Sequence, residues 1–438
     1  MSVFTVLLRI SRITNVICSN TANSIYIASI PGVQSHFHIS TTFAASPITF
    51  FMVGFAIGPV IGTAGSEFFG REYLFKGLLL VSLAFTIVGG SATDFRTLIV
   101  ARVFAGLTAA PCSTIALGIL NDLWDLRSGE LIGNLFLLIY ALLLTWVSEV
   151  GPAMGAAIVR DRDWRWTFWL SAILLAVALV TAIPVPETFQ PEIIRRRAGK
   201  PRPKIQDVLI PTLSRPLHML IFEPIVLPTA MLVTISQVVL FFFYLAFPVI
   251  LQSQYNFSLY SVGMAFLGLF VGSFLALPIA IFLTKVRYQP ALLKAETEPN
   301  GYDRVPEERL WGAMLGSVLG PVSLFWFAWT ARSDIPWIVP IIASAFYGIS
   351  FSLVQICLPI YKNDSFGATY GASSLAADTF VRFGCSSVVP LFSVQMIDKL
   401  TFKWAMSFWA FVSIAVLPVP FVLYYWGPKL RARSRYIQ

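Results

Sequence analysis

Twelve long apolar stretches, six on each side of one basic loop, constrain this chain more than any other feature. Hydrophobic residues make up 57% of its 438 residues, and charged residues only 12%. A helix that crosses a bilayer needs about 20 mostly apolar residues. Only helices or closed barrels satisfy the backbone in lipid, and barrel strands would alternate in polarity. The sequence therefore predicts an all-α membrane protein with twelve transmembrane helices.

The predicted spans cover approximately 13–33, 43–64, 74–92, 97–118, 131–158, 166–185, 225–250, 260–284, 310–330, 336–360, 370–395 and 403–426. They divide the chain into an N-terminal six-helix half (1–186), a cytoplasmic linker (187–223), a C-terminal six-helix half (224–428) and a cytoplasmic tail (429–438). The linker is rich in Arg and Pro and is interpreted as a tether between the halves.

A short pattern recurs at the sixth and twelfth predicted spans. A Trp follows a basic residue at Arg165-Trp166 and at Lys403-Trp404, and each span later carries Pro-Val-Pro. Paired halves suit a transporter that rocks around a central binding site. Chance is the alternative explanation, because Trp beside a basic residue is common at helix ends.

Basic residues gather in the linker, in the segment 285–309 and in the tail, whereas the loops 34–42 and 251–259 contain no Lys or Arg. Cytoplasmic loops of membrane proteins are enriched in Lys and Arg, so both termini are expected in the cytoplasm, and the plasma membrane is the expected location. The sequon at Asn256 then faces outward and is a glycosylation candidate, whereas the sequon at Asn363 faces the cytoplasm.

Several function classes find little support in the sequence. The net charge of +9 follows the topology and no aromatic–basic module is present, which argues against nucleic-acid binding. The four cysteines are scattered in apolar segments without a Cys/His cluster, so neither disulfides nor a metal site is expected, and no cofactor is expected. The three histidines (His36, His38 and His218) are predicted in loops. No HExxH, GxSxG or intramembrane Asp pair indicates an enzyme. A channel or receptor is the other rival class.

Two segments of the first half contain charged residues that are functional candidates. The turn after the second span contains Glu67, Gly70 and Arg71, where Gly permits a tight turn and the charges can pair with a neighbouring helix end. The fourth span contains Arg102. A charge inside a span is costly and is therefore a functional candidate; the alternative is an Arg that reaches out to the membrane interface.

The fifth span contains Glu149, followed by Gly151, Pro152 and Gly155. Small residues along one helix permit close packing with a neighbour, and Pro removes a backbone hydrogen bond and bends the helix. Glu149 is a candidate for protonation. The alternative is a kinked packing helix whose Glu149 faces the outer interface.

In this order, these motifs resemble the major facilitator superfamily, and in particular its fungal branch of twelve-span drug:proton antiporters. The turn from Glu67 to Arg71 resembles the first-loop signature, Arg102 with Gly106 the fourth-span signature, and Gly151-Pro152 with Gly155 the antiporter signature. Segments of the second half agree with that branch: Arg215-Pro216, Glu223-Pro224, 306–310, 325–329 and 361–366.

The resemblance implies alternating access, in which proton entry drives efflux of a small organic compound such as a secondary metabolite, toxin or drug. Proton-coupled uptake and polyamine or organic-anion transport by the same fold are the alternatives. The expected partners are a small-molecule substrate, protons and the lipid bilayer, with no nucleic acid, and the protein is expected to be a monomer.

The charged candidates for proton coupling are Arg102, Glu149, Asp378 and Arg382. Polar residues in otherwise apolar spans are candidates for the substrate cavity: Asn20, Asn23, Tyr26, Asn134, Gln237, Tyr244 and Gln355. Asp378 and Arg382 lie four residues apart on one helical face, where they can pair with each other. Alternatively, Arg382 meets a substrate carboxylate. A set of aromatic residues can serve a flat apolar substrate, but most of its members are predicted to face lipid: Phe51, Phe55, Phe241, Phe242, Phe243 and Trp326.

Overall fold

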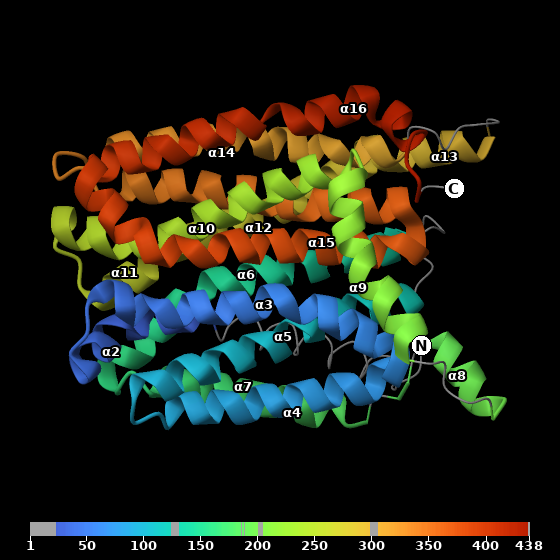
Figure 1. The fold of residues 1–438 in the computed structure, drawn as a ribbon. Helices are drawn as coiled ribbons and strands as arrows, with labels where there is room; N and C mark the ends of the chain where they lie inside the picture. Colours follow the sequence, from blue (N-terminus) through green and yellow to red (C-terminus); the bar gives the residue numbers. More distant parts are fainter. Residues whose placement is uncertain are drawn as a thin grey trace.

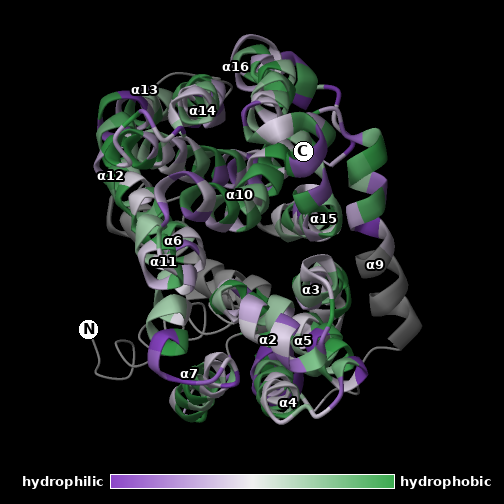
Figure 2. Ribbon diagram, turned by 90° about the vertical axis from the view of Figure 1, so that its left-hand side faces the viewer, coloured by the Kyte–Doolittle hydropathy of each residue, from purple (hydrophilic) through white to green (hydrophobic). Residues whose placement is uncertain are grey.

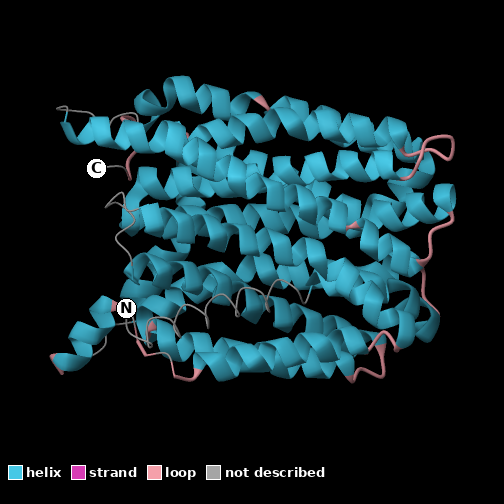
Figure 3. Ribbon diagram, turned by 180° about the vertical axis from the view of Figure 1, so that it is seen from behind, coloured by secondary structure: helices cyan, strands magenta, loops and turns pink. Residues whose placement is uncertain are grey.

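The described part of this computed structural model, residues 23–123, 131–184, 186–187, 189–199, 205–297 and 305–436, is almost entirely helical and contains no strand (Figure 3). The predicted all-α membrane class is confirmed. Within these residues, nine helices are long and apolar enough to cross a bilayer, and α7 (Trp166–Ala182) is apolar but shorter. The number of twelve crossings stays a prediction, because much of the first span lies outside the described residues.

The helices that precede the linker pack together as an N-terminal group (Figure 1). They are η1 (Ile25–Ser29), α2 (Ile30–Phe37), α3 (Thr41–Phe69), α4 (Arg71–Gly90), α5 (Phe95–Leu123), α6 (Leu131–Asp161) and α7. Helix α5 packs against α3 and α4, α4 also packs against α7, and η1 packs against α6. The first predicted span therefore ends later than expected, as a 3₁₀ turn followed by a short α-helix.

A C-terminal group follows the linker. Its elements are α10 (Val226–Tyr255), α11 (Leu259–Ala265), α12 (Leu267–Leu283), the π-helical η2 (Thr284–Tyr288), α13 (Gln289–Thr297), η4 (Pro306–Arg309), α14 (Leu310–Thr330), α15 (Ile338–Val416) and α16 (Pro418–Arg431). Helices α10, α12 and α14 all pack against α15.

Helix α15 is broken at two positions. Gly367 (φ 67°) and Thr401 (φ 63°) leave the right-handed helical region, so α15 consists of three helical segments over 338–366, 368–400 and 402–416. The break at Gly367 falls between the tenth and eleventh predicted spans, and the break at Thr401 falls between the eleventh and twelfth. A positive φ favours Gly at such a turn because Gly has no Cβ to clash.

The linker contains two helices, α8 (Gln190–Arg197) and α9 (Ile205–Phe222), where the sequence predicted a tether. Helix α9 packs against α3 of the N-terminal group and against α15 of the C-terminal group (Figure 2). The linker therefore also contacts both groups. The histidines predicted in loops are in fact at helices: His218 lies in α9, His36 in α2, and His38 caps the end of α2.

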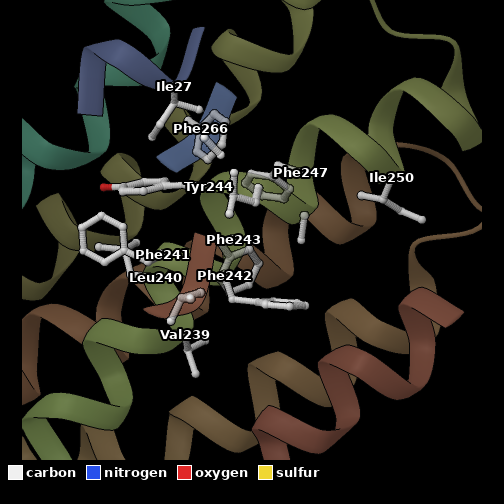
Figure 4. Close-up of a cluster of buried hydrophobic side chains, with 14 of the residues drawn as sticks. Ile27, Val239, Leu240, Phe241, Phe242, Phe243, Tyr244, Phe247, Ile250 and Phe266 are labelled. Carbon is white, nitrogen blue, oxygen red and sulfur yellow. The ribbon is translucent and has the colours of Figure 1, made fainter. Parts of the chain in front are cut away.

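The two groups meet through several helix contacts, of which those of α3 and α6 are the most extensive. Helix α3 packs against α15, and α6 packs against α11 and α12. A large buried apolar cluster includes side chains from both groups, among them Ile27 from η1, Phe243 and Phe247 from α10, and Phe266 at the junction of α11 and α12 (Figure 4). The prediction that the aromatic residues mostly face lipid is wrong for Phe51, Phe55, Phe241, Phe242 and Phe243, which are at most 5% exposed.

The segments that carry the basic residues lie at one end of the bundle. Helix α8, helix α13 and the C-terminal end of α16 extend from the same end, opposite to α2 and α11 (Figure 1). This arrangement agrees with the charge pattern that assigns the linker, the segment 285–309 and the tail to one side of the membrane.

The same close helix contact occurs once in each group. In the N-terminal group, a Cβ on Gly54 would lie 2.2 Å from the carbonyl oxygen of Val103, and a Cβ on Gly106 would lie 2.1 Å from that of Phe51. In the C-terminal group, a Cβ on Gly272 would lie 1.8 Å from the carbonyl oxygen of Ala345, and one on Gly348 would lie 2.2 Å from that of Leu269.

In both contacts, each helix contributes one glycine. The carbonyl oxygen that lies close to the glycine of the opposite helix belongs to the residue three positions before the glycine of its own helix. The contact between α3 and α5 is therefore repeated between α12 and the first segment of α15. This repeat is an internal correspondence between the halves that the Trp and Pro patterns did not reveal. Backbones approach so closely only where no side chain separates them.

Alanine substitutions test this contact. Gly106→Ala and Gly348→Ala would push a methyl group into an opposing backbone, so each is expected to destabilise the protein by about 1–3 kcal/mol. Gly77→Ala and Gly384→Ala are matched controls, because no atom lies within 4 Å of an added Cβ at either position. Thermal unfolding of the purified protein in detergent measures the difference. Equal melting temperatures for all four variants would contradict the close contact.

Candidate functional site

A buried carboxyl group joins the two helix groups. Glu149 of α6 is 0% exposed, and Ser273 of α12 donates a hydrogen bond of 2.6 Å to its Oε1. The same hydroxyl lies 3.1 Å from the carbonyl oxygen of Gly348 in α15. Glu149 Oε2 has no hydrogen-bond partner in the described part of the chain. Glu149 therefore does not face the outer interface, which was the alternative interpretation of this helix.

A second polar contact lies beside Glu149. The phenol of Tyr244 in α10 donates a hydrogen bond of 2.7 Å to the carbonyl oxygen of Ser148, so α10 as well as α12 makes a polar contact with α6. Tyr244 is 1% exposed. Thr145, one turn earlier on α6, lies 3.5 Å from Ser352 of α15 through the hydroxyl oxygens.

Lys362 and Asp378 form a buried ion pair between the first two segments of α15. The Lys362 side chain is 0% exposed and contacts Asp378 Oδ2, whereas Asp378 Oδ1 has no hydrogen-bond partner among the described residues. The pairing of Asp378 with Arg382 is therefore wrong, because Lys362 occupies the carboxylate. A paired charge in the membrane interior costs much less than an isolated one, which explains how both residues are buried.

Arg382 instead contacts a neutral network. Its Nη1 donates a hydrogen bond of 2.8 Å to Gln355 Oε1. The Gln355 amide donates in turn to Gln237 Oε1, to Ser236 Oγ and to the carbonyl oxygen of Val233, each at 3.3 Å. Two cavity candidates, Gln237 and Gln355, and one coupling candidate, Arg382, are thus joined in one network.

Arg102 lies inside the N-terminal group. It is 5% exposed, so it does not reach out to the membrane interface. Its guanidinium carbon lies 4.5 Å from the ring centres of Tyr26 and Phe168 and 5.6 Å from that of Phe51. Aromatic faces attract a cation, and the attraction is strongest away from water. The hydroxyl of Tyr26 donates a hydrogen bond of 2.8 Å to the carbonyl oxygen of Ala44.

The remaining cavity candidates are only partly described. Asn23 is 8% exposed, and its Oδ1 has no hydrogen-bond partner within the described ranges. Asn20 lies outside the described residues. Asn134 lies in α6, but its side chain is not among those described, and the same holds for Glu67 in α3.

The small residues of α6 contact η1 closely. A Cβ on Gly151 would lie 1.9 Å from Ser24 Oγ, and one on Gly155 would lie 2.5 Å from the carbonyl oxygen of Ile25. Pro152 lies between them inside the helix. The glycines thus allow the polar end of the first span to pack on the helix that carries Glu149.

At the end of the bundle that carries the basic segments, Glu187 caps α4. Gly70 adopts φ 92° between α3 and α4, and the backbone N–H groups of Arg71 and Glu72 donate to the two oxygens of Glu187 at 3.1 and 3.3 Å. A carboxylate at a helix N-terminus satisfies free N–H groups and interacts favourably with the helix dipole. In the sequence analysis, residue 187 is the first of the linker, and no contact is predicted for it.

The cap also connects to the linker. Arg196 of α8 lies 3.7 Å from Glu187 and 2.7 Å from Glu192. The hydrogen bond from Arg195, together with Arg196, lowers the pKa of Glu192 to about 2, so Glu192 stays ionised at neutral pH.

Motif segments of the second half also meet at this end. Arg309 pairs with Asp364 at 2.5 Å, and Glu307 pairs with Arg431 at 2.9 Å. Asp364 and Arg309 come from the segments 361–366 and 306–310 that carry the family resemblance. Their pairing explains why these distant segments contain charged residues.

Lys362 and Ser273 are the site residues that sequence reasoning missed. A Lys next to an apolar run is a signal for a buried charge, but the predicted tenth span ended at residue 360 and left Lys362 in a loop. Ser273 has no sequence signal, because a Ser among apolar residues is common in packed membrane helices.

The fold and the buried charges define a helical membrane transporter, and the comparisons give its family. Residues 13–390 match the Major Facilitator Superfamily, so the chain belongs to this family. It is 30% identical to Polyamine transporter 4 of Saccharomyces cerevisiae over 94% of this chain and 67% of that protein. It is 34% identical to the MFS-type efflux pump MFS2 of Trichophyton rubrum over 94% of this chain and 71% of that protein.

Other relatives are also fungal efflux pumps and multidrug transporters at about 30% identity. Among solved structures, the proton:xylose symporter XylE matches the fold with a TM-score of 0.69 and 12% identity, over 98% of both chains.

The buried ion pair predicts a specific pattern of stabilities. Lys362→Met leaves the Asp378 carboxylate without a counter-ion, and Asp378→Asn does the same to Lys362. Each single variant is expected to lose about 3 kcal/mol or more, whereas the double variant is expected to recover most of the loss. Thermal unfolding in detergent checks this. A double variant as unstable as the two single changes added together would show that the residues do not interact.

Proposed function

We propose that this protein is a proton-coupled efflux transporter that exports a small organic compound by alternating access between its two helix groups. The efflux pumps and multidrug transporters among its relatives support export. The observation that carries the proposal is the contact of Glu149 with Ser273, because it places a protonatable group where the two groups meet. A group that couples proton binding to alternating access is expected to contact both halves, because transport moves one half against the other.

The geometry around Glu149 suits both protonation states. A Ser hydroxyl has one proton to donate. When Glu149 is ionised, Ser273 donates to it; when Glu149 is protonated, Glu149 donates to Ser273 Oγ, which donates to the carbonyl oxygen of Gly348 instead. Proton binding therefore changes how α6 is held by α12 without leaving a buried hydroxyl unpaired.

Asp378 is the second proton-coupling candidate. Lys362 holds its carboxylate, so a proton that binds Asp378 competes with Lys362 for the same group. Release of Lys362 would change the contact between the first two segments of α15. Arg102 belongs to the N-terminal group and serves there as a buried cation held by aromatic rings.

Two motifs are proposed to guide the conformational change. Gly70 and Arg71 form the turn whose N–H groups are capped by Glu187, so the contact between α4 and the linker can form in one state and open in another. Gly151, Pro152 and Gly155 let α6 pack closely on η1 and bend. Proton-coupled uptake is the second candidate function, because the structural neighbour is a symporter.

Export is tested in inside-out vesicles from yeast that lacks its own drug pumps. Glu149→Gln is expected to reduce pH-gradient-driven accumulation of a transported compound at least tenfold, because it removes the proton-binding group. Ser148→Ala is a matched control, since its hydroxyl donates only within α6, to the carbonyl oxygen of Thr145. Gradient-driven transport by Glu149→Gln at the normal rate would exclude Glu149 as the proton carrier.

The proposed location is the plasma membrane with both termini in the cytoplasm, and the proposed form is a monomer. Asn256 caps α10 at the end opposite to the basic segments and is exposed. In a eukaryotic cell, we expect a glycan on Asn256 and none on Asn363. The measurement is a gel shift after enzymatic deglycosylation, with Asn256→Gln as the control. A glycan on Asn363 would reverse the orientation.

A further inference from the structure

Arg382 is a cation without a carboxylate partner in the described part of the chain. Asp378 lies one turn away on the same helix, but Lys362 engages it. The Arg382 guanidinium makes one hydrogen bond, to the neutral Gln355, and its Nε has no partner among the described residues. A guanidinium has five N–H donors, so most of its capacity is unused.

Arg382 is also held in position. The Gln355 amide nitrogen faces three acceptors on α10, which fixes Gln355 with its oxygen directed at Arg382. The guanidinium carbon lies 4.7 Å from the centre of the Phe383 ring. An arginine fixed in this way loses little conformational freedom when it binds an anion.

The surroundings of Arg382 are aromatic and lie between the two groups. The rings of Phe383 in α15 and Phe55 in α3 are 4.5 Å apart between centres, so they join the C-terminal group to the N-terminal group beside Arg382. Arg382 itself is partly exposed. A cation next to aromatic walls between the groups is a suitable place for an apolar substrate with one charged end.

Among the described residues, the Lys362–Asp378 pair and Arg382 together carry one positive charge. Lys362 and Asp378 neutralise each other, and Arg382 remains. In the low dielectric of a membrane protein, this balance attracts an anion and repels an organic cation. It therefore disfavours a polyamine, although one relative of this chain is named as a polyamine transporter.

We propose that Arg382 recognises the carboxylate of an aromatic or otherwise apolar organic acid, which is the substrate class of this transporter. The proposal rests on the proposed function, that the chain exports a small organic compound. The carboxylate binds the free N–H groups of Arg382 in a two-point contact, and the aromatic part of the substrate lies against Phe383 and Phe55.

The probes are 2-naphthoate, its neutral amide 2-naphthamide, and spermidine. Binding to the purified full-length protein is measured from the shift in thermal unfolding. The unmodified protein is expected to bind 2-naphthoate at least tenfold more tightly than 2-naphthamide, and not to bind spermidine. Arg382→Gln is expected to weaken 2-naphthoate binding about tenfold to hundredfold and to leave 2-naphthamide unchanged.

Three further variants sharpen the test. Arg382→Lys keeps the charge but loses the two-point contact, so it is expected to bind 2-naphthoate with intermediate affinity. Gln355→Glu puts a carboxylate at the position that already contacts Arg382, so it is expected to remove the preference for 2-naphthoate. This variant tests the proposal even if Arg382→Gln does not fold. Arg332→Gln is the matched control, because Arg332 is exposed and pairs with Asp334 in a loop.

Equal binding of 2-naphthoate and 2-naphthamide, binding of spermidine, or an unchanged preference in both Arg382→Gln and Gln355→Glu would overturn the proposal. Transport in vesicles separates it from the proposed function. Export of 2-naphthamide or spermidine, but not of 2-naphthoate, would reject acid recognition and keep efflux. If the pH gradient drives none of the probes or standard antifungal drugs, efflux itself is rejected, and the binding data still decide the role of Arg382.

Discussion

The absence of water in the bilayer interior is the constraint on which the rest of this structure depends. A charge in that region needs a partner inside the protein. The buried charges of the candidate site meet the requirement differently: Lys362 and Asp378 pair with each other, Glu149 accepts a hydrogen bond from the Ser273 hydroxyl, and Arg102 lies among aromatic rings. Arg382 contacts a neutral amide, and its Nε has no hydrogen-bond partner among the described residues. Lys362 and Asp378 neutralise each other, whereas Arg382 has no carboxylate partner in the described part of the chain, and this difference underlies the proposal that Arg382 binds an anion.

The sequence predicted the class of fold because the apolar stretches and the basic loops depend only on composition and position. It also indicated charges that the structure buries, since Arg102, Glu149 and Asp378 lie inside apolar runs. It could not predict their partners. The pairing of Asp378 with Lys362 depends on how the chain turns at Gly367, which brings residue 362 to residue 378. Helical periodicity favoured Arg382 as the partner of Asp378, because periodicity describes one helix and not the turn between two helices.

The buried aromatic residues illustrate the same limit. Phe241, Phe242 and Phe243 follow one another in α10, and an apolar helix of a membrane protein can bury any of its faces. Between residues 241 and 251 of α10, Tyr244 is the one polar side chain, so the sequence there does not mark which side faces the protein. The packing of α10 against α15 and α14 decides the question: Phe242 contacts Trp409, Phe243 contacts Phe327 and Tyr347, and all three rings are buried.

At Gly348, the close contact between α15 and α12 also positions the hydroxyl that donates a hydrogen bond to Glu149. Gly348 has no side chain, so the backbone of α15 lies close to α12 at Leu269. That approach also brings the carbonyl oxygen of Gly348 within 3.1 Å of Ser273 Oγ, the hydroxyl that donates to Glu149. The equivalent contact in the N-terminal group, between Gly106 and Phe51, has Phe55 in the position of Ser273. Both groups therefore contain the same close backbone contact. In the C-terminal group, the Ser273 hydroxyl links this contact to the protonatable carboxyl group of Glu149.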